Sequence, residues 1–218
     1  MQKSKMIELL SNFSTKDLTR FGEFLASPFF NKDEEVLLFY NFFKPLGPDF
    51  TSKKVDKDYI LSKGITGLQL TEKKLSYLMN YVVEYAEEYI QITQFQSQKT
   101  ENLIQLLKKY NTWGADKFFE KTLTKIQNSS ELHAIKDTDY WLNQYQIASE
   151  STFYFDRLKI RSFDPSLQQA ADYLDLFYIS TKLKYLCELM NRQQSMHHLP
   201  VNSSPPHFLL LWAILNRC

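Results

Sequence analysis

The chain has 218 residues, with 26 Lys and Arg, 25 Asp and Glu, and a net charge of +1 at neutral pH. Affinity for nucleic acid that does not depend on base sequence comes from an excess of basic residues, so this balance argues against nucleic acid as the main partner. Hydrophobic residues make up 44% and charged residues 23%, proportions that exclude an intrinsically disordered chain.

Glycine and proline are scarce in this sequence, with 5 and 7 residues, and no proline occurs between Pro48 and Pro165. Turn-rich β-sandwiches and barrels use both residues at their corners, whereas the interiors of long helices exclude both. Aromatic residues are abundant at 15% and supply large side chains that hold helices together. The composition therefore predicts an all-α fold.

Apolar residues recur at helical spacing from the start of the chain. A short helix is expected over residues 2–11. A second helix opens at Ser14, which has an acidic residue, Asp17, at the position of a capping box. Ser27-Pro28 ends this helix because the residue before a proline avoids the α region. Asn31 is the expected N-cap of the third helix.

The middle of the chain predicts one short and one long helix. Ser52 is expected to cap the short helix, which ends near Gly64. Thr71 is expected to begin a long helix that runs to about Gln98. Its main apolar stripe has a spacing of three and four and consists of Leu75, Leu78, Met79, Val82, Ala86, Tyr89 and Thr93.

Three further helices are expected after this long one. The first opens at Thr100 and ends near Tyr110, and residues 111–114 form a break before a helix over 115–128. The third helix begins at Asp137 or Thr138. The apolar face expected on it consists of Trp141, Tyr145, Ala148, Thr152 and Phe155.

Asp164-Pro165 is a helix-start pattern, and the last helix runs from there to about Met196. Two apolar rows follow this helix: the first is Leu167, Ala171, Leu174, Tyr178, Thr181 and Tyr185, and the second is Leu176, Ile179, Leu183, Leu186 and Met190. Apolar cover on more than one side predicts burial on more than one side. The helix is either central in its own domain, or its second face meets a partner or a further stretch of a longer parent protein.

Motifs that carry common chemistry are absent from the sequence. The glycines form neither GxGxxG nor GxxxxGK[ST], so the common phosphate-binding loops are missing, as are HExxH, CxxC and GxSxG. The four histidines, at positions 133, 197, 198 and 207, match no familiar zinc spacing together with Cys218. We therefore expect no metal ion, no cofactor and no enzymatic activity.

Two cysteines, Cys187 and Cys218, are too few for a disulfide framework, and Cys187 is expected to be a small buried side chain within the last helix. Glu8 interrupts the apolar residues at the N-terminus, so they do not form the core of a signal peptide. The longest apolar run, residues 208–215, is far below the roughly 20 residues of a membrane-spanning helix. We expect a cytoplasmic protein without a membrane span.

The expected helix starts have no constant period, which is typical of an irregular array of antiparallel helix pairs, either α-solenoid-like or an orthogonal bundle. Residues 1–196 are expected to form this helical domain. Residues 197–218 differ in composition, with prolines followed by an apolar run. They are either a hydrophobic clip on the domain or on a partner, or a segment outside the evolved domain, as after a frameshift or a premature end.

Two segments resemble a family of uncharacterised helical bacterial proteins with tetratricopeptide-like character. They are Phe13 to Asn31, which contains Phe-Leu-Ala-Ser-Pro-Phe-Phe-Asn, and Leu174 to Gln193. The resemblance covers residues from about 10 to 196 and implies a helical structure without catalytic residues. Members of the family are longer than this chain, and the sequence after Met196 departs from their pattern, so we expect the chain to be the N-terminal part of a longer protein.

The expected function is that of a non-catalytic helical scaffold that binds another protein or a peptide, or associates with itself, through helix faces. The candidate anchors are Tyr178, Ile179, Leu183 and Leu186. The alternative is a nucleic-acid-associated regulatory protein that uses the basic residues Arg157, Lys159 and Arg161. An enzyme of unrecognised type is a third alternative.

Overall fold

The computed structural model describes residues 4–129, 136–159 and 164–195. Within these ranges the regular structure consists of nine α-helices and two 3₁₀ turns, without a strand, so the predicted all-α class is confirmed. The chain divides into two compact units, Met1–Lys99 and Thr100–Cys218. The boundary between them falls inside the single helical domain expected over residues 1–196. Residues 197–218, the four histidines and Arg161 lie outside the described residues.

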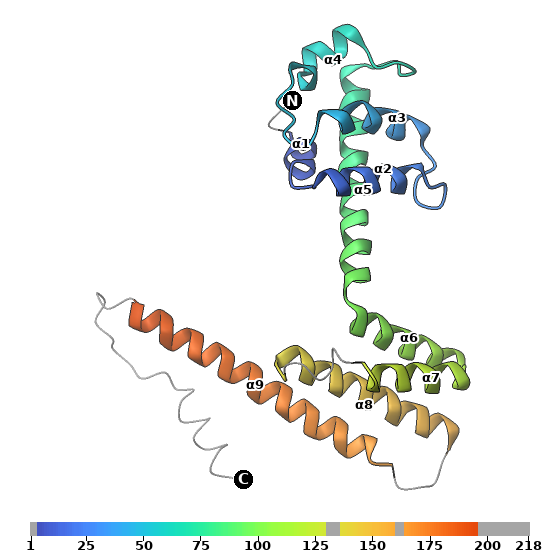
Figure 1. The fold of residues 1–218 in the computed structure, drawn as a ribbon, viewed down its shortest axis with the longest axis vertical. Helices are drawn as coiled ribbons and strands as arrows, with labels where there is room; N and C mark the ends of the chain where they lie inside the picture. The colour runs from blue at the N-terminus through green and yellow to red at the C-terminus, as the bar shows by residue number, and fades with distance from the viewer. Residues whose placement is uncertain (1–3, 130–135, 160–163, 196–218) are drawn as a thin grey trace. The chain divides into compact units, whose positions relative to one another are not determined.

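The first unit is built around its longest helix, α5, against which α1, α2 and α3 pack (Figure 1). Its elements are α1 (Lys5–Leu10), α2 (Thr15–Ala26), α3 (Glu34–Phe43), η1 (Lys44–Leu46), η2 (Lys53–Val55), α4 (Lys57–Lys63) and α5 (Glu72–Ser97). The buried residues of α5 are Leu75, Leu78, Val82, Ala86 and Tyr89. All five belong to the predicted stripe, and Met79 packs partly buried beside them.

The predicted capping box at the start of α2 is confirmed. The backbone N–H of Asp17 donates to the hydroxyl of Ser14 at 3.1 Å, and the backbone N–H of Ser14 donates to the Asp17 carboxylate at 3.2 Å. These reciprocal bonds satisfy donors that the first helical turn leaves without intrahelical partners. The hydrogen bond from the Ser14 side chain also lowers the pKa of Asp17 from its ordinary value of 3.8.

The prediction that Asn31 caps the third helix is wrong, because the N-cap of α3 is Asp33, whose carboxylate accepts the backbone N–H of Glu35 at 2.9 Å. Asn31 is instead buried, and its side-chain amide donates to the carbonyls of Leu25 and Asp33, both at 2.9 Å. Both residue types favour helix starts. The carboxamide of asparagine has N–H donors, whereas the carboxylate of aspartate has none. Asn31 therefore lies in the turn, where it donates to the carbonyl of Leu25 near the end of α2, and Asp33 is left to cap α3.

Two more predicted helix starts can be compared with the structure. Ser52 caps the 3₁₀ turn η2 by accepting the backbone N–H of Lys54 at 3.2 Å, whereas α4 begins only after Asp56, so the predicted helix is shorter than expected. Its end at Gly64, where φ is +69°, agrees with the prediction. Thr71 caps α5 as predicted.

Aromatic side chains fill the core of the first unit. The ring of Phe21 lies 4.8 Å from that of Tyr40 and 5.5 Å from that of Tyr89, measured between centroids. The hydroxyl of Tyr40 donates to the carbonyl of Leu18 at 2.5 Å, so the buried phenol has a partner. Burial raises the pKa of Tyr40 far above its ordinary value of 10.

The second unit contains four helices: α6 (Lys99–Trp113), whose first residue falls at the boundary, α7 (Asp116–Gln127), α8 (Thr138–Leu158) and α9 (Ser166–Ser195). Its core joins α6, α7 and α8 through Ile104, Leu107, Phe119, Ile126, Ile147 and Tyr154. The rings of Phe119 and Tyr154 are stacked, with centroids 4.4 Å apart.

The predicted break over residues 111–114 is wrong, since α6 continues to Trp113. Asn111 lies inside this helix, almost fully buried, and its side-chain amide donates to the carbonyl of Glu150 in α8 at 3.0 Å. A tertiary hydrogen bond therefore outweighs the low helix propensity of asparagine. The turn comes one residue after the helix, at Gly114, where φ is +67°.

The apolar face predicted for α8 is incomplete, because this helix has two packed sides. Of the five predicted residues Ala148 is buried and the other four are half-buried, and the buried set further includes Ile147, Ser151 and Tyr154. Ile147 and Tyr154 belong to the core with α6 and α7. Trp141 lies on the side of α9, where its ring stacks on that of Tyr173 at 6.1 Å.

We expect Ser14→Ala to destabilise the first unit by about 1 kcal/mol, the usual value of an N-cap side chain. The measurement is native-state hydrogen exchange of buried α5 amides, with Ser62→Ala in the exposed part of α4 as the control. Because the folded-state pKa of Asp17 is lowered, its share of the stability is present above its ordinary value of 3.8 and is lost as the pH falls through the folded-state pKa. Equal effects of the two substitutions at pH 7 would contradict the capping role.

We expect the stability of the second unit to fall with a tyrosine titration at alkaline pH. Burial, first, and the hydrogen bond to Glu120 raise the pKa of Tyr154 to about 12, so the folded state retains a proton that the unfolded state loses near 10. The stabilisation is therefore complete below pH 10 and is lost as the pH rises toward 12. Denaturant unfolding followed by tryptophan fluorescence should show a smaller alkaline loss in Tyr154→Phe than in the wild type. All three tryptophans, at 113, 141 and 212, lie in this unit, and an identical loss would refute the assignment.

Candidate partner-binding face on helix α9

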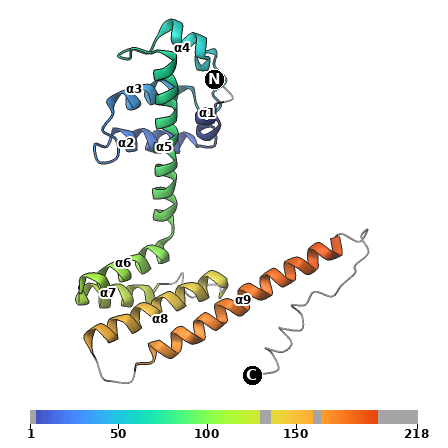
Figure 2. The ribbon, with the colours of Figure 1, turned by 180° about the vertical axis from the view of Figure 1, so that it is seen from behind.

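Helix α9 begins where the sequence predicts. The carboxylate of Asp164 accepts the backbone N–H of Ser166 at 2.9 Å and its hydroxyl at 2.6 Å, directly beside Pro165. The hydroxyls of Ser166 and Thr152 lie 2.8 Å apart and connect this start to α8. The two helices then run side by side, and α9, with 30 residues against 21, continues past the end of α8 (Figures 1 and 2).

Most of the α9 surface is open to solvent. Over residues 166–192 only Ser166 is buried. The large apolar side chains that are 38–67% exposed on this helix are Leu167, Leu174, Leu176, Tyr178, Ile179, Leu183, Tyr185, Leu189 and Met190. Single exposed apolar side chains are common on proteins, whereas monomeric soluble proteins rarely expose large contiguous apolar patches.

The exposed residues form the two rows that the sequence indicates. At about 100° per residue, the first row, Leu167 to Tyr185, and the second row, Leu176 to Met190, lie on different sides of the helix. The third side faces α8 and includes Tyr173, which stacks on Trp141. Within each row the spacing alternates between three and four, which is the a/d pattern of helices that pack along their length.

The four predicted anchors all lie on this open surface. The exposed fractions of Tyr178, Ile179 and Leu183 are 50%, 38% and 47%, and Leu186 is half-buried. Ile179, Leu183 and Leu186 share the second row, whereas Tyr178 belongs to the first. The ammonium group of Lys182 lies 5.9 Å from the ring centroid of Tyr178.

One expectation for α9 is corrected by the structure. In the described part of the chain α9 packs mainly against α8, and the two alternatives for its second face, burial within its own domain or contact with a partner, stay predictions. Cys187, expected to be buried, is exposed. It lies between the second row and the α8 side, beyond the stretch of α9 that α8 covers.

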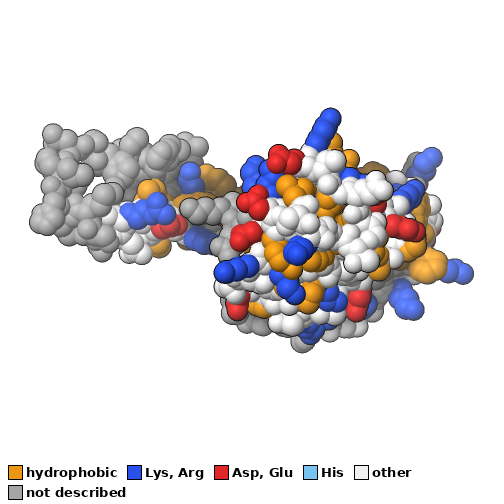
Figure 3. Space-filling view, turned by 90° about the horizontal axis from the view of Figure 1, so that it is seen from above, with side chains coloured by type: hydrophobic (Ala, Val, Ile, Leu, Met, Phe, Trp, Pro, Cys, Tyr) orange, Lys and Arg blue, Asp and Glu red, His pale blue; other side chains and the backbone are white. Residues whose placement is uncertain are grey.

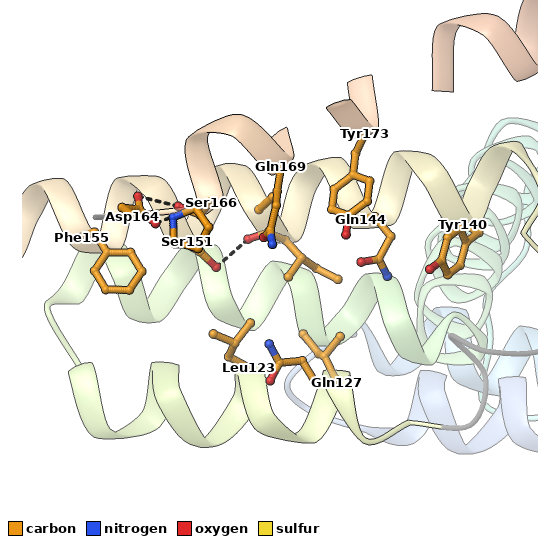
Figure 4. A pocket seen from close by; sticks show the side chains of 14 residues that line it. Leu123, Gln127, Tyr140, Gln144, Ser151, Phe155, Asp164, Ser166, Gln169 and Tyr173 are labelled. Atoms are coloured by element: carbon orange, nitrogen blue, oxygen red, sulfur yellow. Dashed lines mark hydrogen bonds between the residues drawn. The ribbon is translucent and has the colours of Figure 1, made fainter. Parts of the chain in front are cut away.

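A groove between α7, α8 and the first turns of α9 was not foreseen from the sequence (Figure 4). Its volume is about 520 Å³, and its floor is apolar, with Leu123, Ile126 and Ile147 among the lining residues. Gln127, Gln144 and Gln169 come to it from the three helices, as Figure 4 shows. The groove forms only when three separate helices assemble, so no local sequence pattern indicates it.

The polar groups of the groove are largely engaged in helix structure. The Ser151 hydroxyl donates to the carbonyl of Ile147 at 2.9 Å, and the Asp164 carboxylate holds Ser166. Among the described residues no group of three His, Cys, Asp or Glu side chains could hold a metal ion.

The basic cluster of the nucleic-acid alternative is only partly available. The guanidinium of Arg157 pairs with the Asp116 carboxylate and lies over the ring of Tyr154 at 5.6 Å. Lys159 is exposed at the left-handed end of α8, and Arg161 lies outside the described residues. On the face seen in Figure 3, acidic and basic side chains are interspersed with apolar ones.

None of the helices in the described ranges is long and apolar enough to cross a membrane. No family model, no curated protein and no solved structure matches this chain. The resemblance to tetratricopeptide-like bacterial proteins therefore stays a prediction that rests on the two quoted segments.

We expect Leu183→Gln to leave the free energy of unfolding of the second unit within about 0.5 kcal/mol of the wild type, as for surface substitutions without a packing role. Phe119→Ala in the core should cost about 3–5 kcal/mol. Denaturant unfolding followed by tryptophan fluorescence measures both. A loss of several kcal/mol in Leu183→Gln would show that other residues of the chain cover this row.

Proposed function

We propose that this protein is a non-catalytic helical scaffold that binds another protein through α9. The observation that carries the proposal is the pair of exposed apolar rows on a helix that has a described neighbour on one side only. Covering a side chain such as Leu183 or Ile179 removes apolar surface from water at about 25 cal/mol per Å². A partner that covers the rows gains this free energy, because the described residues of the chain leave these side chains exposed.

The partner is expected to offer a helix with its own apolar stripe, which would lie along the exposed side of α9 and contact its apolar rows. The spacing of three and four in each row suits side chains that interdigitate with such a stripe. Tyr178, Ile179 and Leu183 lie near the middle of the exposed length, where water is most fully excluded and where energetically dominant residues concentrate.

The nucleic-acid alternative depends on Arg157, Lys159 and Arg161. It is the weaker candidate because Arg157 already has a carboxylate partner in Asp116. Binding to nucleic acid would weaken steeply with added salt, whereas binding through apolar rows is tolerant of salt. The capture experiment below is therefore run at low and at high ionic strength.

We expect the full chain to capture a defined protein reproducibly, and we expect the double variant Ile179→Ser/Leu183→Ser to retain less than a tenth of it. Affinity capture with quantitative mass spectrometry measures the difference. The matched control is Phe153→Ser on α8, which removes an apolar side chain of similar exposure, 56%, from the same unit. Equal capture by all three forms would show that α9 is not the binding surface.

A further inference from the structure

We propose that the partner of α9 is the α9 of a second copy of this chain, packed antiparallel against the side that faces away from α8. This inference rests on the proposed function and names the partner for the same surface. The twofold axis of the pair passes at the level between Tyr178 and Ile179. Such an interface uses the same patch on both copies and closes at two subunits.

The residues midway between the two rows carry the argument. They form an outer strip that consists of Gln168, Asp175, Lys182 and Leu189, together with Ala171 at the inner edge of the first row and Leu186 at the inner edge of the second. At about 100° per residue these positions lie on the side of the helix opposite α8. The strip has the same spacing when it is read from either end, so an antiparallel copy aligns it with itself.

The alignment matches side chains as well as positions. It places Ala171 opposite the partner copy's residue at position 186, a leucine, so that a small side chain meets a large one. On the two flanks, Tyr178 and Ile179 each lie near the twofold axis and close to their own equivalents. The first row then runs beside the first row of the other copy, and the second row beside the second.

Charge selects the antiparallel direction. The alignment brings Asp175 of each copy to the level of Lys182 in the other, whereas a parallel pair would place like charges at the same levels. Among the described residues neither side chain has an ion-pair partner within its own chain. Asp175 lies far beyond the first turn of α9, so the helix dipole does not account for an acidic residue at this position.

The exposed length is sufficient for a stable contact. Residues 168–189 extend over about 32 Å at 1.5 Å per residue. A stable interface covers about 800 Å² on each partner, and one helix reaches this value only when it is engaged along most of such a length. The first row flanks the strip from Leu167 to Tyr185 and the second row flanks it from Leu176 to Met190.

We expect the full chain to sediment as a dimer, with twice its mass of 25.9 kDa, at micromolar concentration in analytical ultracentrifugation. Asp175→Lys or Lys182→Asp alone places like charges opposite each other twice and should weaken association at least tenfold. Mixing the two single variants should restore it, since each then meets an opposite charge. Lys184→Asp, on the α8 side of the helix, is the control and should leave association unchanged.

Each other outcome would overturn the inference. A monomer at all concentrations excludes the second copy. A dimer whose association is unchanged by Asp175→Lys and by Lys182→Asp shows that the contact lies elsewhere or is parallel. A monomer in which Leu183→Gln is strongly destabilising assigns the face to residues of the same chain, such as 197–218. A monomer that still captures another protein through Ile179 and Leu183 overturns only this inference. If the chain is a monomer and its capture of other proteins is also unaffected by Ile179→Ser/Leu183→Ser, the proposed function is overturned too.

Discussion

Helix α9 carries more apolar surface than one neighbouring helix can cover, and the organisation of the second unit follows from this constraint. Helix α8 takes one side of α9, with Tyr173 stacked on Trp141, and both apolar rows stay open. Helix α8 itself is already shared, because Ile147 and Tyr154 face α6 and α7. In the described part of the chain the unit thus has a core of three helices and an outer helix, α9, whose apolar rows stay exposed.

Comparison with α5 shows that the apolar sides of a helix and its neighbours together decide how much of it is covered. Both helices are long, 26 and 30 residues, and both repeat apolar residues at a spacing of three and four. Around α5 the chain supplies α1, α2 and α3, and residues such as Val82 and Ala86 are completely covered. Around α9 the main described neighbour is α8. One apolar stripe with three neighbours therefore yields a core in the first unit, and two apolar rows with one main neighbour yield an open face in the second.

Local interactions could be predicted from the sequence and tertiary ones could not. The capping box of Ser14 and Asp17 involves four neighbouring residues, so its pattern is sufficient for the prediction. Asn31 and Asn111 were assigned to a cap and a break because of their own propensities, but distant carbonyls, such as that of Glu150, decide where they lie. The four anchors on α9 were predicted from the rows, whereas the groove of α7, α8 and α9 needs three helices in place. Periodicity shows how many sides of a helix are apolar and does not show which neighbour covers each side.

The face of α9 is already helical in the chain by itself, and this affects what an interface there can achieve. Asp164 caps the helix, α8 packs against it, and the helix is continuous from Ser166 to Ser195, so a partner meets Ile179 and Leu183 on a formed helix. Exposed ion pairs such as that between Asp175 and Lys182 of two copies contribute at most about 1 kcal/mol each. Apolar contact therefore supplies the affinity, and charge supplies the direction of pairing. A helix from a different protein could use the same apolar rows, but it would need a basic residue against Asp175 and an acidic one against Lys182 to match what a second copy already provides.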